Sequence, residues 1–298
     1  MAMEKIEMTC KDGQVLKGNA WVLKEAKANV VLVTGMEEYS ARYDGLATYL
    51  NEKGYSVYCL DHFGQGENAP TEADLGKWEP SGFRKTVNRL DELVMRLKVT
   101  CLPIYLVAHS MGSFISQDYI QRYSQHIDKV VLVGSCGPRI ATKFGGFVAK
   151  LVVNKKNYNK KAYFFDKLIF GRSNSRIKDH KTPSDWISKN EENVAKYIQD
   201  PYCGYVSTYG FYKEFFKGLN RLGKKQFLGK IRKNLPILLL AGQEDPVGLY
   251  GKGVKKLEKL YQKYHLPVEC ILYPELRHEI LNENVPAVYD DLLAFLDK

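Results

Sequence analysis

The strongest constraint on the fold is a pattern repeated through the first half of the chain, in which short apolar runs alternate with longer amphipathic segments. The apolar runs have the length of buried strands, and the longer segments place apolar residues every three or four positions, as helices do. Predicted strands occupy 29–36, 55–61, 101–110 and 128–135, and predicted helices occupy 41–54, 83–98 and 113–126. Repeats of strand, helix and strand build a mostly parallel sheet with helices on both faces, so we predict an α/β fold.

The pattern returns near the end of the chain, with predicted strands at 235–245 and 267–276 and a closing helix at 285–298. The opening stretch 5–23 differs, because two alternating runs flank an Asp-Gly turn at 12–13. Such a turn predicts an antiparallel hairpin, which we place at the edge of the sheet. Both ends of the chain therefore contribute to one sheet.

The segment 139–233 interrupts the strand pattern and carries an unusual composition. It contains 22 of the 44 Lys and Arg residues, 7 of the 34 Asp and Glu residues, and 17 of the aromatic side chains. Its charge is therefore +15, while the rest of the chain carries −5 and the whole carries +10. We predict a helical cap inserted between two parts of an α/β core, 1–138 and 234–298.

Several classes of protein are excluded by what the sequence lacks. No apolar run reaches the ~18–20 residues that a membrane-spanning helix needs, and the first residues lack the apolar core of a signal peptide. The six cysteines are scattered without a Cys-x-x-Cys spacing. We therefore expect a cytoplasmic protein with free, buried thiols and no metal site. The glycine-rich pieces fit no phosphate-binding or dinucleotide-binding motif, so we expect no cofactor.

The pentapeptide Ala108-His109-Ser110-Met111-Gly112 lies where the third predicted strand passes into a helix. It resembles the nucleophile elbow of the α/β-hydrolase superfamily, with alanine in place of the first glycine. In such an elbow a strained turn presents the serine hydroxyl above the sheet, and the small flanking residues let strand and helix approach. Ser110 is thus the predicted nucleophile. The alternative is a serine that caps an ordinary helix.

A serine hydroxyl needs an adjacent base, and the base needs an acid that orients it. Asp245 and His278 follow the last two predicted strands, in the order Ser, Asp, His that this superfamily uses. Both lie past the carboxyl ends of strands, where open α/β sheets bind ligands. The alternatives are Glu244 for the acid and, for the base, His62, His109, His126, His180 and His265. Because only His278 follows the last strand, we predict the triad Ser110, Asp245 and His278.

Acyl transfer through a serine also needs two backbone N–H groups that stabilise the oxyanion. One comes from the residue after the nucleophile, here Met111, and the other from the loop after an early strand, here Met36. Gly35, His109 and Gly112 complete the predicted neighbourhood of the site.

The loop that holds Met36, TGMEEYSARY at 34–43, resembles the H-G-x-x-E-H-S-x-R-Y stretch of monoacylglycerol lipases and related bacterial lysophospholipases. Thr34 and Tyr39 stand where that family has histidines. Further likeness to the family lies in DHFGQGEN at 61–68, in the lid-like stretch 182–219 and in RHEILNE at 277–283. The resemblance implies a serine ester hydrolase that cleaves monoacylglycerols, lysophospholipids or short esters without a metal or cofactor. It also implies a mobile cap that forms an apolar acyl tunnel.

The basic and aromatic segment 139–233 admits three interpretations: a solvated lysine face, a single-strand nucleic-acid platform, or a surface for anionic lipid. We favour peripheral contact with an anionic membrane and expect no nucleic acid. Two functional alternatives remain open. One is a proline-iminopeptidase-like serine peptidase, which needs acidic residues in the cap to hold a free amine. The other is a non-catalytic lipid-binding or nucleic-acid-binding module on the same fold.

Overall fold

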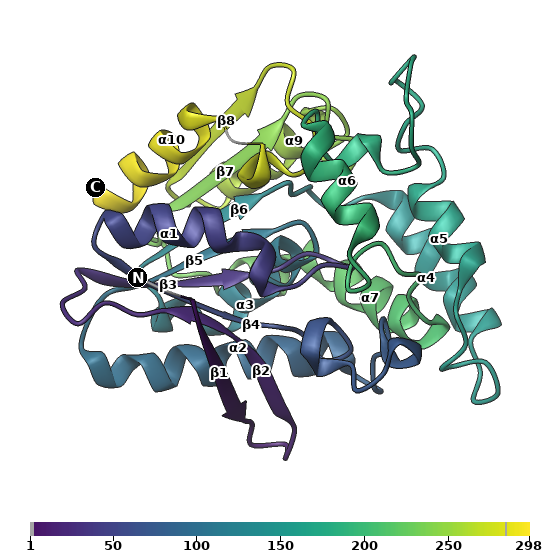
Figure 1. Cartoon of the computed structure of the whole chain (residues 1–298), viewed down its shortest axis with the longest axis horizontal. Helices are drawn as coiled ribbons and strands as arrows, with labels where there is room; N and C mark the ends of the chain where they lie inside the picture. The colour runs from purple at the N-terminus through teal and green to yellow at the C-terminus, as the bar shows by residue number, and fades with distance from the viewer. Residues whose placement is uncertain (1–2, 284) are drawn as a thin grey trace.

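The computed structural model describes residues 3–283 and 285–298. Within them one sheet of eight strands has the order β1-β2-β4-β3-β5-β6-β7-β8 (Figure 1). The strands are β1 (Glu4–Thr9), β2 (Val15–Trp21), β3 (Ala28–Val33), β4 (Tyr55–Leu60), β5 (Ile104–His109), β6 (Lys129–Val133), β7 (Ile237–Gly242) and β8 (Val268–Tyr273). All pairings are parallel except those of β2 with β1 and with β4, so the predicted edge hairpin is confirmed.

Helices fill the connections between the parallel strands. The α-helices are α1 (Asp44–Glu52), α2 (Gly82–Leu97), α3 (Met111–Tyr123), α4 (Ile140–Val152), α5 (Tyr163–Phe170), α6 (Glu191–Gln199), α7 (Tyr209–Leu222), α8 (Lys225–Leu228), α9 (Lys252–Lys263) and α10 (Pro286–Asp297). Short 3-10 helices are η1 (Ser40–Tyr43), η2 (Gly66–Asn68), η3 (Glu72–Asp74), η4 (Lys98–Thr100), η5 (Ser124–His126), η6 (Asp185–Ile187) and η7 (Ile280–Asn282). The predicted crossover helices and strands are confirmed, within a few residues at their ends.

The two faces of the sheet are covered by different helices because strand side chains alternate in direction. On β5, Leu106 packs in a core with α2, α3 and α9, whereas its neighbour Val107 packs in a second core with α1 and α10. On β7, Leu239 and Leu238 divide between the two cores in the same way. Burial on both faces explains why these strands appeared in the sequence as continuous apolar runs.

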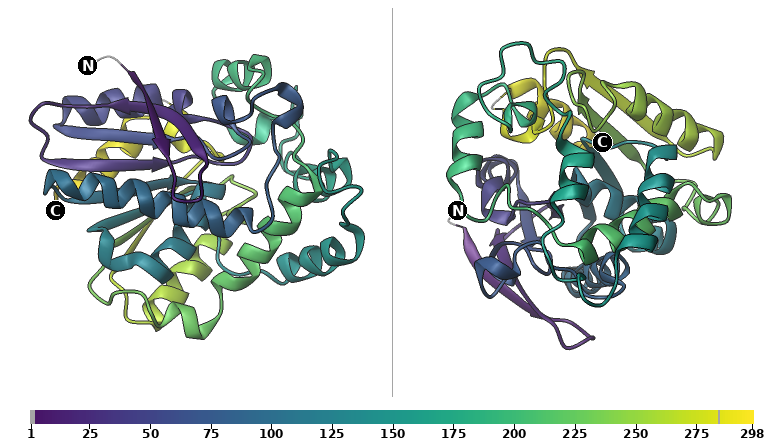
Figure 2. Two further views of the ribbon diagram at one scale, coloured as in Figure 1. Left: turned by 90° about the horizontal axis from the view of Figure 1, so that it is seen from below. Right: turned by 90° about the vertical axis from the view of Figure 1, so that its right-hand side faces the viewer.

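The segment between β6 and β7 supplies α4 to α8. Helices α4 to α7 gather beyond one end of the sheet, on the right in Figure 1, and the turned views keep them there (Figure 2). The assignment of 139–233 as a cap of its own stays a prediction. In the described part of the chain, no helix combines the length and the hydropathy needed to cross a bilayer.

The expectation of buried thiols is correct for four cysteines, Cys10, Cys59, Cys136 and Cys203. It is wrong for Cys101, which is exposed in the turn after η4, and Cys270 is only half-buried because β8 is an edge strand. None of the six is in a disulfide.

The continuous burial of the central strands leads to a stability prediction. Leu106→Ala removes a fully buried side chain at the middle of the sheet and is expected to lower the free energy of unfolding by about 2–5 kcal/mol. Urea denaturation followed by circular dichroism measures the loss. The control is Val99→Ala, at a side chain that is 83% exposed, for which we expect a change within about 0.5 kcal/mol. Equal effects of the two substitutions would contradict this account of the core.

Candidate active site

The junction between β5 and α3 has the strained geometry of a nucleophile elbow. Ser110 lies between the two elements with φ 50° and ψ −118°, a conformation that is costly for a residue with a side chain. Its N–H donates a hydrogen bond to the carbonyl of Val133 on the neighbouring strand (2.9 Å). A Cβ at Gly112 would lie 2.1 Å from the carbonyl oxygen of Val33, so only glycine allows α3 to pass this close to β3. Ala108 is fully buried, and its methyl group belongs to the core between the sheet and α3.

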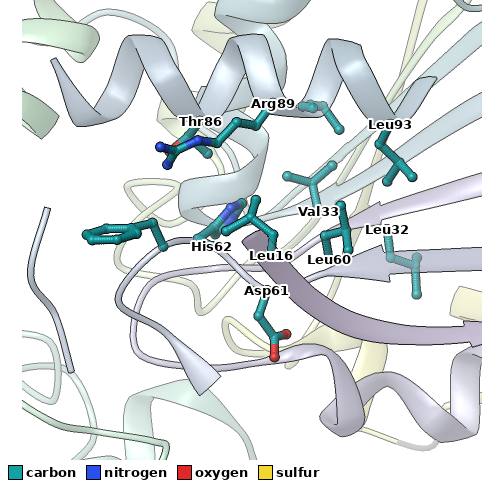
Figure 3. Close-up of a pocket in the computed structure, with 11 residues that line it drawn as sticks. Leu16, Leu32, Val33, Leu60, Asp61, His62, Thr86, Arg89 and Leu93 are labelled. Carbon is teal, nitrogen blue, oxygen red and sulfur yellow. The ribbon is translucent and has the colours of Figure 1, made fainter. Parts of the chain in front are cut away.

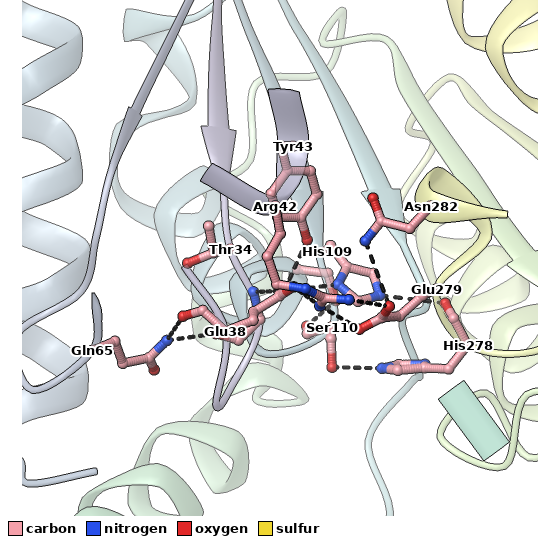
Figure 4. Close-up of polar contacts among 12 residues, drawn as sticks. Thr34, Glu38, Arg42, Tyr43, Gln65, His109, Ser110, His278, Glu279 and Asn282 are labelled. Carbon is pink, nitrogen blue, oxygen red and sulfur yellow. Dashed lines mark hydrogen bonds and ion pairs between the residues drawn. The ribbon is translucent and has the colours of Figure 1, made fainter. Parts of the chain in front are cut away.

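The structure brings the three residues of the predicted triad together. The Nε2 atom of His278 lies 2.8 Å from Oγ of Ser110 (Figure 4). The Nδ1 atom of His278 lies 3.0 Å from Oδ1 of Asp245. Asp245 is completely buried, and the same Oδ1 accepts a hydrogen bond from the N–H of Val247 (2.8 Å). The ring of Trp186, from η6, packs 5.1 Å from the His278 ring and restricts its orientation.

The alternative acid and bases lie in other environments. Glu244 faces the basic side chains of Lys189 (3.3 Å) and Arg277 (3.8 Å). The nearest polar partners of the other histidines are the Thr34 carbonyl for His62, Glu38 for His109, Asp91 for His126 and the Ile177 carbonyl for His180, while His265 lies in the turn after α9. Burial lowers the pKa of His62 to about 4, so its ring is neutral.

The loop after β3 passes directly against Ser110. A Cβ at Gly35 would lie 3.1 Å from Cβ of Ser110, which shows how close the two backbones come. Met36 and Met111, the predicted oxyanion donors, both line the pocket that contains Ser110. On its far side the loop is held by Gln65, whose Nε2 donates to the carbonyls of Gly35 (2.9 Å) and Glu38 (2.8 Å).

A buried carboxylate organises this loop, and the sequence analysis did not single it out. Glu38 accepts hydrogen bonds from the N–H of Gly35, the hydroxyl of Tyr43 (2.8 Å) and Nη1 of Arg42 (3.1 Å), and it lies 2.9 Å from Nδ1 of His109 (Figure 4). Burial alone would raise the pKa of the Glu38 carboxyl, but His109, Arg42 and Tyr43 outweigh it and lower the pKa to about 2. Glu38 is therefore a carboxylate with four polar partners.

Arg42 connects this loop to the histidine loop and to α6. Its guanidinium forms two parallel hydrogen bonds to Glu279, Nη1 to Oε1 at 2.6 Å and Nη2 to Oε2 at 2.7 Å. Glu279 follows His278 in the chain and also accepts a hydrogen bond from Nδ2 of Asn193 (2.9 Å). Burial raises the pKa of Glu279, and Arg42 overcomes this effect and lowers it. The signal for Glu38 and Arg42 was present in the sequence, because both match letters of the family-like stretch 34–43.

The two positions where this loop departs from the family-like stretch have different surroundings. The carbonyl of Thr34 contacts Nε2 of His62 (3.1 Å), while its own buried hydroxyl has no hydrogen-bond partner in the described part of the chain. The hydroxyl of Tyr39 donates to Oδ2 of Asp200, after α6 (2.8 Å). Tyr39 therefore ties the loop to the inserted segment.

An apolar pocket of about 450 Å³ opens at Ser110, between the sheet and the inserted helices. Its apolar lining includes Phe114, Phe144, Leu168, Phe170, Phe215, Phe216, Leu219 and Leu222. Two arginines, Arg139 and Arg172, also line it, and no carboxylate of the described residues does. A pocket of this size and composition suits an acyl chain.

A second, much smaller hollow of about 30 Å³ lies between the sheet and α2, beside Asp61, His62 and Arg89 (Figure 3). It has room for a water molecule only. Arg89 is occupied by ion pairs with Asp12 (2.7 Å) and Glu79 (2.5 Å), so this hollow is part of the structural core.

The sheet order and the strained serine between β5 and α3 define an α/β-hydrolase, and the chain is a serine hydrolase. It belongs to the serine aminopeptidase S33 family (Hydrolase_4), whose sequence model matches residues 24–285.

Similar proteins are named as lipases and esterases. A probable lysophospholipase L2 of Haemophilus influenzae is 26% identical over 270 residues, which cover 85% of this chain and 78% of that protein. The monoglyceride lipase of Saccharomyces cerevisiae is 24% identical over 286 residues, 92% of this chain and 86% of that protein. The crystal structure of a thermostable carboxyl esterase from Bacillus coagulans superposes with a TM-score of 0.91 at 25% identity, covering 100% of this chain and 98% of that one.

The buried network formed by Glu38, Arg42 and Glu279 leads to a prediction about stability and its pH dependence. Arg42→Met leaves two buried carboxylates, Glu38 and Glu279, without their shared cation and is expected to cost about 3–5 kcal/mol at pH 8. In the wild type, the pKa of Glu38 is about 2, below its ordinary value of 4.5. The ionised Glu38 therefore stabilises the fold at pH values above 4.5, and this stabilisation is lost as the pH falls toward 2. In the variant the pKa of Glu279 should rise, because Arg42 no longer lowers it. The loss of stability caused by Arg42→Met should therefore become smaller as the pH is lowered from 8 to 5.

Urea denaturation at a series of pH values measures both effects. The matched control is Lys196→Met, which breaks an exposed ion pair with Glu192 and should change the stability by less than about 1 kcal/mol at every pH. A penalty for Arg42→Met that is small, or independent of pH, would show that the network does not hold these loops.

Proposed function

We propose that this protein is a serine carboxylic-ester hydrolase that acts on single-acyl lipids through Ser110, His278 and Asp245. The observation that carries the proposal is the contact between the Ser110 hydroxyl and His278 at the mouth of an apolar pocket. The strained backbone of Ser110 adds support, because strain of this kind concentrates at functional sites.

In the proposed mechanism Ser110 Oγ attacks the ester carbonyl while Nε2 of His278 takes the hydroxyl proton. The Nδ1–H of His278 donates to Asp245, which keeps the ring in the required tautomer and stabilises its positive charge. The N–H groups of Met36 and Met111 stabilise the oxyanion. His278 then protonates the leaving alcohol, and an acyl-enzyme on Ser110 remains. Water, deprotonated by His278, releases the fatty acid and restores the free serine.

Single-acyl lipids are the proposed substrates because the pocket at Ser110 is lined by phenylalanine and leucine side chains and occupies about 450 Å³. The names of the relatives, lysophospholipase and monoglyceride lipase, point to the same class. The peptidase alternative fits this lining less well. A free amine needs a carboxylate partner, whereas the charged side chains around this pocket are Arg139 and Arg172.

Hydrolysis of p-nitrophenyl esters from acetate to palmitate tests the proposal. Ser110→Ala should lower kcat by a factor on the order of 10³ or more, and Asp245→Asn by roughly 10⁴, because the asparagine favours the wrong imidazole tautomer. Ser116→Ala is the matched control, since this buried serine of α3 has a hydroxyl without a hydrogen-bond partner among the described residues. Undiminished activity in Ser110→Ala would refute the serine mechanism.

We also propose that the inserted segment contacts anionic membranes through α4 and α5. On α4 an exposed apolar stripe consists of Ile140, Phe144, Phe147 and Leu151, which are 61–83% exposed. Their spacing of three and four residues puts them on one face of the helix. On α5 the exposed apolar residues are Tyr163, Phe164 and Leu168.

The surroundings of this apolar stripe suit a lipid surface. Exposed lysines lie on and between the two helices: Lys143, Lys150, Lys155, Lys156, Lys160 and Lys167. Lysines of this kind are attracted to anionic headgroups, while exposed apolar side chains enter the acyl boundary. Because Phe144 and Leu168 also line the pocket at Ser110, a lipid could pass from the membrane into the pocket.

Vesicle sedimentation tests the membrane contact. The double variant Phe147→Ser and Leu151→Ser should lose most of its binding to vesicles that contain anionic lipid, and the wild type should bind neutral vesicles more weakly than anionic ones. Val99→Ser, which changes an even more exposed apolar residue next to α2, should bind like the wild type. Equal and negligible binding of the wild type to neutral and anionic vesicles would disprove the contact.

A further inference from the structure

A second large pocket, of about 480 Å³, adjoins the pocket at Ser110 and shares Ser173 and Tyr250 with it. Unlike the first pocket, it is lined mostly by polar and charged side chains. The charged residues are Arg176, Lys178, Asp179, Lys189, Glu244 and Arg277. Neither the predicted triad nor the apolar acyl site accounts for this lining.

The pocket has an excess of positive charge, with four cationic side chains and two carboxylates. Glu244 is shared between Lys189 (3.3 Å) and Arg277 (3.8 Å), so one carboxylate faces two cations. In the part of the chain that the structure describes, Arg176 and Lys178 form no ion pair. An anion that enters this pocket would therefore meet cations whose charge is not already neutralised.

Two of the cations are held in place. Nη1 of Arg277 donates to the carbonyls of Asp185 (2.7 Å) and Ser188 (2.9 Å). Its Nε is buried and has no hydrogen-bond partner among the described residues, because Glu244 at 3.8 Å is too distant. The guanidinium of Arg176 stacks on the ring of Tyr250 at 3.6 Å. Fixed guanidinium groups with free N–H donors are suited to phosphate.

The pocket lies next to the reacting groups. Arg277 and Glu244 immediately precede His278 and Asp245 in the chain, and Tyr250 forms part of both pockets. An ester with its acyl chain in the apolar pocket and its carbonyl at Ser110 therefore has room for its alcohol portion past Tyr250.

We propose that this second pocket binds the phosphate of an anionic head group, so that the preferred substrates are single-acyl glycerol esters with a net negative phosphate. The inference rests on the ester hydrolysis proposed above and specifies its substrate. A neutral glycerol head group offers no ionic partner to Arg176 and Lys178, which form no ion pair among the described residues. A quaternary ammonium group would meet four cations against two carboxylates, and the ring of Tyr250, the aromatic side chain among the described lining residues, is already covered by Arg176.

The test compares two esters with the same acyl chain, 1-octanoylglycerol and 1-octanoylglycerol 3-phosphate, each below its critical micelle concentration so that no lipid surface is present. Wild-type kcat/KM should be higher for the phosphate ester by roughly 10- to 100-fold, about the value of one hydrogen bond to a charged group. In Arg176→Ala with Lys178→Ala this ratio should fall to about 1, because the phosphate ester loses its advantage over 1-octanoylglycerol. The matched control, Lys224→Ala with Lys230→Ala, removes the same charge from exposed residues outside both pockets and should keep the ratio.

Other outcomes would overturn the assignment. A wild-type ratio near 1, or a ratio that survives the double substitution, would refute the head-group site while hydrolysis of 1-octanoylglycerol still supports the ester hydrolase. No hydrolysis of either ester would remove the proposed function itself. Inorganic phosphate should compete with the phosphate ester. If it instead changes kcat for 1-octanoylglycerol in a manner that depends on Arg176, the pocket is a site for free phosphate and the head-group assignment fails.

Discussion

The contact on which the structure depends is the approach of α3 to β3 at Gly112. A side chain there would overlap the carbonyl oxygen of Val33, so glycine alone lets the helix start directly above the sheet. At this close approach Ser110 adopts a strained backbone conformation with positive φ, and its side chain lies beside the loop that carries Gly35 and Met36. The buried cores on both faces of the sheet hold this strained turn in place, because relaxing it would separate well-packed strands and helices.

The site also requires that three segments from distant parts of the chain keep one arrangement. These are the loop after β3, the turn between β5 and α3, and the loop after β8. The network of Glu38, Arg42 and Glu279 meets this requirement, since Glu38 and Arg42 lie just after β3 and Glu279 follows His278 in the chain. His109 extends the network toward Ser110, and its Nε2 lies 3.3 Å from the carbonyl of His278. Buried ion pairs contribute little net stability because desolvation is costly, but they disfavour other arrangements of the same loops strongly. The network therefore fixes geometry more than it adds free energy.

The sequence predicted the sheet well because strands buried on both faces leave continuous apolar runs, as β5 and β7 do. It also predicted three residues that the structure brings together, because each follows a parallel strand at the same edge of the sheet; their catalytic roles remain a proposal. The pairing of Arg42 with Glu279 was not predicted. The two residues are 237 positions apart, and neither periodicity nor spacing marks a buried ion pair. The structure of the inserted segment was harder still to predict, because α4 exposes its apolar stripe, whereas apolar positions of a helix usually face a core.

The positive charge of the inserted segment divides into two groups with different physical settings. The lysines around α4 and α5 are exposed, so water and salt screen their charges. Screened charges of this kind attract extended, highly charged surfaces rather than single small anions. Arg176 lies in the inserted segment and Arg277 lies in the loop after β8, and both line one pocket. Stacking on Tyr250 and hydrogen bonds to carbonyls hold their guanidinium groups in place, so a single phosphate can contact several donors. In the two proposals, the first setting selects the surface at which the enzyme works, and the second selects the ester that it accepts there. The same excess of basic residues can therefore serve both location and specificity, provided that the two groups occupy different faces of the insertion.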